Sequence, residues 1–173
     1  MIQLPIIGAF LEAAGMIFEK KILRRKGVDF KNYTSYEFLA ISLLSLPFLY
    51  FFWRVDSGAF KAFNLLIFGF IVLVSVLANL LIFYSLKREN LTEFEPIWLM
   101  QPLFTILLAF VFYSDERNWT TVVLALIASL SLVLSHVKKH HLNFDKYIIA
   151  ALLGNFFFAV ELVASRLVLD YYS

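Results

Sequence analysis

Residues 63–86, FNLLIFGFIVLVSVLANLLIFYSL, decide the fold class of this chain. A helix needs about 20 mostly apolar residues to cross a hydrocarbon core about 30 Å thick, because each residue adds roughly 1.5 Å. The stretch is longer than that and contains no charged residue. It is also too long and too continuously apolar for a strand of a membrane β-barrel, in which apolar and polar residues alternate. It therefore predicts a transmembrane helix.

Further apolar stretches lie on both sides of this one. Together the expected spans cover residues 2–23, 38–53, 63–86, 94–113, 119–137 and 147–169. The chain of 173 residues is 61% hydrophobic and 16% charged, with a mean hydropathy of +0.80. A soluble domain is about half apolar and about a quarter charged. The sequence thus predicts an all-α, polytopic membrane helix bundle of about six transmembrane helices.

The composition argues against several classes of function. The chain has no cysteine, so disulfides and cysteine–metal sites are excluded. A net charge of +2 is too small to indicate nucleic-acid binding. The sequence also lacks the glycine-rich phosphate loop, the nucleophile elbow and the zinc-binding histidine motif of common enzyme classes. We therefore expect neither an enzyme nor a bound metal or cofactor.

Lysine and arginine are distributed unequally between the two ends of the expected bundle. The loops after the first, third and fifth spans carry six, two and three of them, against four in total on the other side. Because cytoplasmic loops are enriched in these residues, the pattern places those three loops in the cytoplasm and the N-terminus outside. We expect a multi-pass protein of the plasma (inner) membrane.

An internal repeat relates the first and last spans. A shift of 146 residues places Gly8 on Gly154, Phe10 on Phe156 and Lys20 on Arg166. The repeat unit would then be five helices, with residues 1–137 as the first repeat and 138–173 as the loop and first helix of a truncated second repeat. A unit with an odd number of helices inserts in opposite senses when repeated. Such inverted repeats form substrate sites at their interface near the bilayer midplane.

Glu12 is the first residue that could carry chemistry. An ionisable group at the centre of a membrane helix costs about 3 kcal/mol on insertion scales, so it normally faces a cavity or a partner. Gly8, Glu12, Gly15 and Glu19 are spaced four, three and four residues apart and form one stripe of a helix. The glycines would let a neighbouring backbone approach. Glu12 is then either a substrate-cation or proton site or a carboxylate paired with a neighbouring lysine or hydroxyl; Glu19 is interpreted as interfacial.

Glu161 is the second buried carboxylate, in the last span. In the repeat alignment it takes the register of Gly15, about one turn from Glu12. Two carboxylates that face one cavity could share protons. The sequence therefore makes Glu12 and Glu161 the candidate proton- or substrate-binding pair.

The fourth span contains a proline that alters its helix. Pro102 has no amide hydrogen to donate to the carbonyl of Trp98, so a kink or a free carbonyl is expected there. Gln101 beside it, and Asn79 in the third span, are secondary polar candidates for the substrate cavity. Their alternative role is ordinary hydrogen bonding between helices.

Residues 94–119, FEPIWLMQPLFTILLAFVFYSDERNW, resemble the fourth helix of the EamA group in the drug/metabolite transporter superfamily. In this resemblance Pro102 is the family proline and Glu116 the acidic residue that closes the helix, with Asp115 as a rival. The sequence GAFLEAAG around Glu12 is similar to the first helix of small multidrug resistance proteins, whose membrane glutamate exchanges protons for cationic drugs. The resemblance implies ten helices in two inverted five-helix repeats, of which this chain would hold six. Family members usually have a cytoplasmic N-terminus, opposite to the charge pattern.

The resemblance implies a transporter of small organic solutes. Its mechanism would be alternating access, with Glu12 and Glu161 as the candidates for proton coupling or cation binding. Its partners would be a small-molecule substrate and the lipid bilayer. Two alternatives stay open: a dimeric cation or drug exporter, if the chain is naturally this short and forms a homodimer, and a non-transporting, truncated membrane protein.

Overall fold

The computed structural model describes residues 3–52, 54–137, 145–169 and 171. Most of the loop that begins the expected second repeat, at 138–144, lies outside the described residues. Throughout the described part the regular structure is helical: seven α-helices and two short 3₁₀ helices, with no strand. The prediction of an all-α bundle is therefore confirmed.

The helices follow the expected spans in order. Their bounds are α1 (Gln3–Leu23), α2 (Phe30–Phe52), α3 (Ala62–Arg88), α4 (Leu91–Trp98), α5 (Gln101–Phe112), α6 (Trp119–Val137) and α7 (Lys146–Ser165), with η1 (Ser57–Phe60) and η2 (Ser114–Glu116) as 3₁₀ turns. Within the described residues, α2, α3, the α4–α5 unit and α7 are long and apolar enough to cross a membrane.

Two helices differ from the expected spans. α2 begins at Phe30 rather than residue 38, because a polar turn continues the helix beyond its apolar part. In that turn the Thr34 hydroxyl donates to the Phe30 carbonyl (2.8 Å). The fourth span is divided into α4 and α5 at Leu99 and Met100, where Pro102 has no amide hydrogen to donate to the Trp98 carbonyl. The expected interruption at Pro102 is thus a break between two helices.

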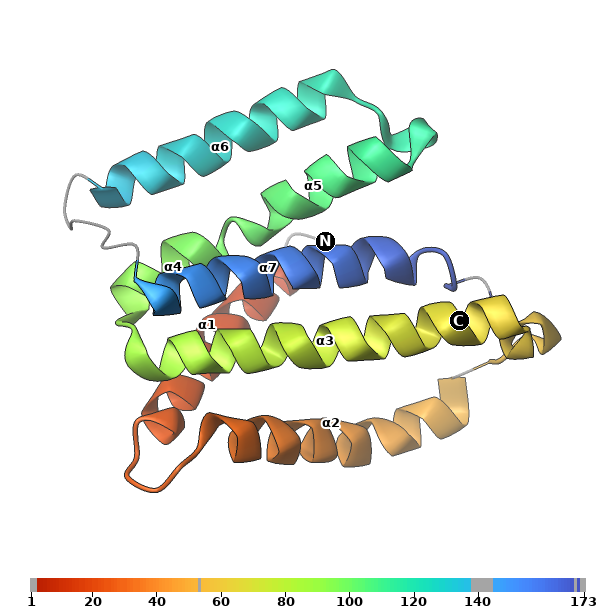
Figure 1. Ribbon diagram of the computed structural model, residues 1–173, viewed down its shortest axis with the longest axis horizontal. Coiled ribbons are helices and arrows are strands. Elements are labelled where there is room, and N and C mark those ends of the chain that lie inside the picture. Colours follow the sequence, from red (N-terminus) through yellow and green to blue (C-terminus); the bar gives the residue numbers. More distant parts are fainter. Residues whose placement is uncertain (1–2, 53, 138–144, 170, 172–173) are drawn as a thin grey trace.

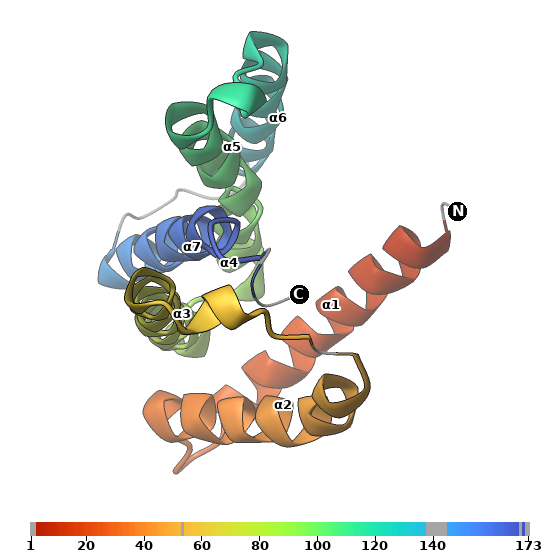
Figure 2. The same ribbon diagram turned by 90° about the vertical axis from the view of Figure 1, so that its right-hand side faces the viewer.

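α3 and α7 form the centre of the bundle, and they make its most extensive helix–helix contact (Figure 1). α2 lies beside α3, while α5 and α6 extend on the other side of α7. Successive spans run in opposite directions, so the ends of α1, α3 and α6 lie at the same end of the bundle as the starts of α2, α4 and α7. α1 crosses the bundle near that end and projects away from it (Figure 2).

Gly154 allows α3 and α7 to pack closely. A Cβ atom at this position would lie 2.8 Å from Ile82 Cγ1 and 3.2 Å from the Ala78 carbonyl oxygen. Ala151 and Ala159, on the same helix, are fully buried. Small residues at a membrane helix interface allow the backbones to approach and gain dispersion contacts. The glycine is therefore required by the central contact of the bundle.

The glycines of α1 do not have this role. At Gly8 and at Gly15 an added Cβ would meet nothing within 4 Å. The expected close approach of a neighbouring backbone is therefore wrong for both positions. Gly8 lies in the N-terminal half of α1, which leaves the bundle (Figure 2), whereas Gly15 lines the cavity described below.

We predict that Gly154→Ala destabilises the protein by about 1–3 kcal/mol, the usual cost of overpacking an interior. Gly69→Ala on α3 is the matched control, because a Cβ there meets nothing within 4 Å. The measurement is the thermal unfolding midpoint of each purified variant in detergent. Equal midpoints for the two variants would contradict the proposed role of the α3–α7 contact.

Candidate functional site

A cavity of about 230 Å³ lies between α1, α2, α3, α4 and α7. It is lined by a polar set of side chains and by an apolar, largely aromatic set. The polar set is Glu12, Glu19, Glu37 and Asn79. The described apolar lining includes Met16, Ile82, Leu86, Phe83, Phe94, Trp98 and Phe158. The cavity therefore combines negative charge with aromatic rings.

The carboxylates reach the cavity from two helices. Glu12 and Glu19 lie on the same face of α1, and Glu37 comes from the first turns of α2. Glu19 lies close enough to Glu37 for their charges to repel each other. One carboxylate oxygen of Glu37 is buried and has no hydrogen-bond partner among the described residues. Since a buried charge normally requires a partner, this cavity favours a positively charged occupant.

Trp98 connects the aromatic wall to the carboxylates. Its indole Nε1 donates a hydrogen bond to Glu12 Oε1 at 3.0 Å. Its ring stacks on Phe94, with centroids 6.1 Å apart, and meets the edge of Phe158 at 5.9 Å. The indole thus holds the Glu12 carboxylate from one side.

A second cavity of about 380 Å³ continues from the first one between α1 and α4. The two share Glu12, Met16 and Trp98, and the second adds Glu95. Glu12 and Glu95 are both exposed. The site is therefore open sideways, along the groove between α1 and α4.

The structure brings together some of the residues predicted from the sequence. Glu12 and Asn79 line the cavity, where Asn79 Nδ2 donates to the Ser75 carbonyl (2.9 Å). Glu161 and Gln101 are not among the described lining residues. Glu161 instead lies beside Ser75 of α3, and its Oε2 is buried with no hydrogen-bond partner among the described residues.

Two lining carboxylates were not predicted. Glu19 was interpreted as interfacial because two lysines follow it, but it faces the cavity. Glu37 was placed outside the second span, and α2 in fact begins earlier. The sequence signal that points to Glu37 is the polar stretch before the apolar part of α2. Glu37 is the single acidic residue of this stretch, which continues into the apolar helix without a break.

Comparison with known proteins identifies the family. The sequence model of the EamA-like transporter family matches residues 1–137. The chain belongs to the EamA-like transporter family. Such proteins are membrane transporters of small solutes, in agreement with the apolar helices described above. No curated protein and no solved structure gives a significant match.

The basic end of this EamA-like bundle is closed by side chains bound to backbone carbonyls. Lys20 is buried, and its ammonium donates to the carbonyls of Leu86 and Glu89 at the end of α3. Arg24 donates to the Asn90 side chain at 2.9 Å. Because the last carbonyls of a helix have no partner within it, these cations complete the end of α3. They also fix the end of α1 to the turn that leads into α4.

Glu89 has the most perturbed environment outside the spans. Its side chain is buried beside Glu93 and Asp145, and burial, together with these two carboxyl groups, raises its pKa from 4.5 to about 7. The cations nearby, Lys20 and Arg24, are directed to the Glu89 carbonyl. Because the pKa is raised on folding, the stability that Glu89 contributes is complete below pH 4.5 and is lost as the pH rises through 7.

We predict that Glu89→Gln makes the protein more stable than the parent at pH 8, by on the order of 1 kcal/mol, and equally stable at pH 4.5. Thermal unfolding midpoints between pH 4.5 and 8 measure this difference. Asp29→Asn is the control, since its side chain is exposed and lies in the loop before α2. A pH-independent offset between parent and Glu89→Gln would contradict the assignment.

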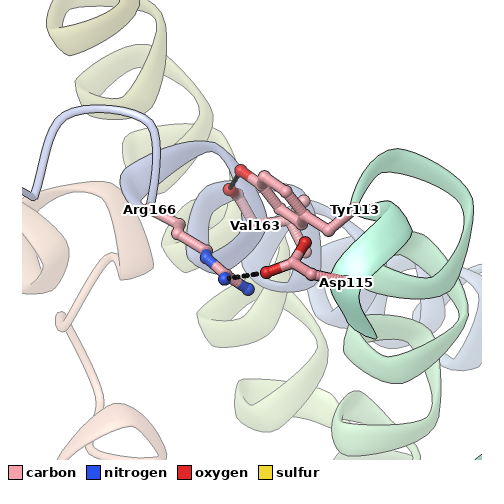
Figure 3. A network of polar contacts seen from close by, with 4 residues as sticks. All are labelled: Tyr113, Asp115, Val163 and Arg166. Carbon is pink, nitrogen blue, oxygen red and sulfur yellow. Dashed lines mark hydrogen bonds and ion pairs between the residues drawn. The ribbon is translucent and has the colours of Figure 1, made fainter. Parts of the chain in front are cut away.

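The opposite end of the bundle has its own polar cluster, which joins α5 to the end of α7 (Figure 3). The Tyr113 hydroxyl donates to the Val163 carbonyl at 2.8 Å, and Arg166 pairs with Asp115 at 2.8 Å. The guanidinium group also lies over the Tyr113 ring, 4.6 Å from its centroid. Asp115, the rival acidic residue in the family pattern, thus binds α7. The side chain of Glu116 lies outside the described part.

Proposed function

We propose that this protein transports small organic cations by alternating access in the plasma membrane, with Glu12 as the main binding carboxylate. The observation that carries the proposal is the cavity in which three carboxylates face four aromatic rings. Aromatic faces attract ammonium groups by about 0.5–2 kcal/mol, with quaternary ammonium ions as the best-known ligands. A volume of about 230 Å³ suits a compact amine, since drug-sized ligands occupy roughly 300–1,000 Å³.

The charge balance of the cavity supports a cationic substrate. A carboxylate in the low-dielectric interior is costly unless a cation or a proton accompanies it. The lysine beside Glu19 in the sequence, Lys20, is directed to carbonyls at the end of α3 instead. Cation and proton would then alternate on the same carboxylates, which gives exchange of one for the other.

We predict that Glu12→Gln lowers uptake of tetraethylammonium into proteoliposomes at least tenfold, because the neutral amide neither attracts the cation nor releases a proton. Asp29→Asn, a loop carboxylate outside the cavity, is the control and keeps parental uptake. Glu161→Gln tests the other sequence candidate. We expect it to change uptake less than twofold, since Glu161 contacts Ser75 and not the cavity.

The outcomes separate the hypotheses. Parental uptake by Glu12→Gln would exclude the cavity carboxylate as the binding group. A larger loss in Glu161→Gln than in Glu12→Gln would move the coupling site to the α3–α7 contact. No uptake by the parent, for this cation or for smaller amines, would favour the non-transporting alternative.

The open groove favours a second candidate, in which two copies form the exporter. Glu12 and Glu95 face the groove between α1 and α4, and a charge that faces hydrocarbon costs about 3 kcal/mol. A second copy of the chain that covers this groove would remove that cost.

For the dimer, we predict that Ala13→Trp, which fills the groove, weakens association at least tenfold. Ala40→Trp on the exposed surface of α2 is the control. Sedimentation equilibrium at several protein-to-detergent ratios measures the association. A parent that stays monomeric at all ratios would exclude the dimer and leave the cavity assignment untouched.

A further inference from the structure

The break between α4 and α5 lies against α7 at a fully buried asparagine. Asn155 is completely inaccessible to solvent, and its Nδ2 donates to the Ile97 carbonyl at 2.5 Å. The same carbonyl accepts the Met100 amide at 3.0 Å. α7 therefore supplies a side-chain donor to one of the last carbonyls of α4, that of Ile97, at the point where the helix is interrupted.

The next residue after Ile97 is Trp98, which reaches the cavity. Its backbone belongs to the turn that Asn155 holds, and its indole donates to Glu12. Phe158, three residues after Asn155, lies on the same face of α7 and contacts the Trp98 ring. Two side chains of α7 thus support Trp98, one through its backbone and one through its ring.

An apolar residue would serve equally well if this position only filled space. A buried amide is costly to desolvate, and it is retained where its hydrogen bond is specifically required. In an uninterrupted helix the Gln101 amide would donate to the Ile97 carbonyl, whereas here the Met100 amide and Asn155 Nδ2 donate to it. The requirement for Asn155 therefore follows from the break, and the break sets the direction of Trp98.

We propose that Asn155 is a positioning residue: its amide fixes the turn between α4 and α5 and thereby directs the Trp98 indole to Glu12. This inference rests on the proposed function only in that Glu12 binds the transported cation. With its carboxylate held from one side by the indole, Glu12 presents the other side to the cavity. The binding group is then oriented before the substrate arrives, which reduces the entropic cost of binding.

The fluorescence of Trp98 tests the proposal without a transport assay. The chain has three tryptophans, so the full-length protein carrying Trp53→Phe and Trp119→Phe reports on Trp98 alone. Glu12→Gln replaces the charged acceptor of the indole N–H and is expected to shift the emission maximum. The proposal requires this shift to shrink at least threefold in Asn155→Leu, which has similar volume and no donor.

Asn64→Leu is the matched control, because Asn64 is also buried and also donates to a backbone carbonyl, that of Gly58 at 2.9 Å, far from Trp98 in the chain. The Glu12→Gln shift should be unchanged in this background. If Asn155→Leu does not fold, as judged by far-UV circular dichroism, Asn155→Ala replaces it, because alanine is smaller than asparagine and cannot overpack the site.

Each result decides the proposal. The proposal is overturned if Glu12→Gln shifts the emission maximum as much in the Asn155→Leu and Asn155→Ala backgrounds as in the protein that keeps Asn155. The absence of any shift in the background that keeps Asn155 would overturn it too. Loss of the shift in Asn64→Leu as well would have the same consequence, because the effect would then reflect general loosening. The fluorescence measurements do not depend on cation uptake, so failure of the positioning proposal can be distinguished from failure of the proposed transport function.

Discussion

The close contact of α3 and α7 at Gly154 is the interaction on which the rest of the structure depends. Because a Cβ atom at this position would overlap the Ile82 side chain, only glycine lets α7 approach α3 to this distance. The approach brings the neighbouring residue, Asn155, against the turn after α4, and brings Phe158 to the cavity wall. A packing requirement at one residue thereby determines how the aromatic side of the site is built.

The second constraint is the free energy of charge in a membrane. Polar groups at membrane depth persist where they face one another, a cavity or a backbone group that accepts them. In the bundle, Lys20 binds carbonyls at the end of α3, Glu161 lies beside Ser75 at the α3–α7 contact, and Glu12 binds the Trp98 indole. Of these three charged residues, Glu12 is the one that lines an open cavity. Its hydrogen-bond partner there, the Trp98 indole, is uncharged.

The sequence predicted the elements better than it predicted the site. Apolar length is a local property, so the spans, their order and the interruption at Pro102 followed from it directly. Glu12 was found for the same reason, as a charge within an apolar run. Glu37 was missed because it lies near the start of a helix, where polar residues are normal. Glu161 was paired with Glu12 because a repeat alignment gives the register of a residue but not the direction in which its side chain points. The close approach expected at Gly8 failed likewise, since spacing along one helix does not say whether another helix lies beside it.

The two halves of α1 are attached to the bundle unequally. The N-terminal half of α1 is exposed, as at Ile6 (63%) and Phe10 (73%), whereas its C-terminal end is fixed by Lys20 to the end of α3. Elements with few buried contacts move at the lowest free-energy cost. Between these two parts, the hydrogen bond from Trp98 to Glu12 is the described side-chain bond that holds α1 at the cavity. The same carboxylate therefore joins α1 to α4 and lines the open cavity. One carboxylate thus connects the position of α1 to the wall of the cavity.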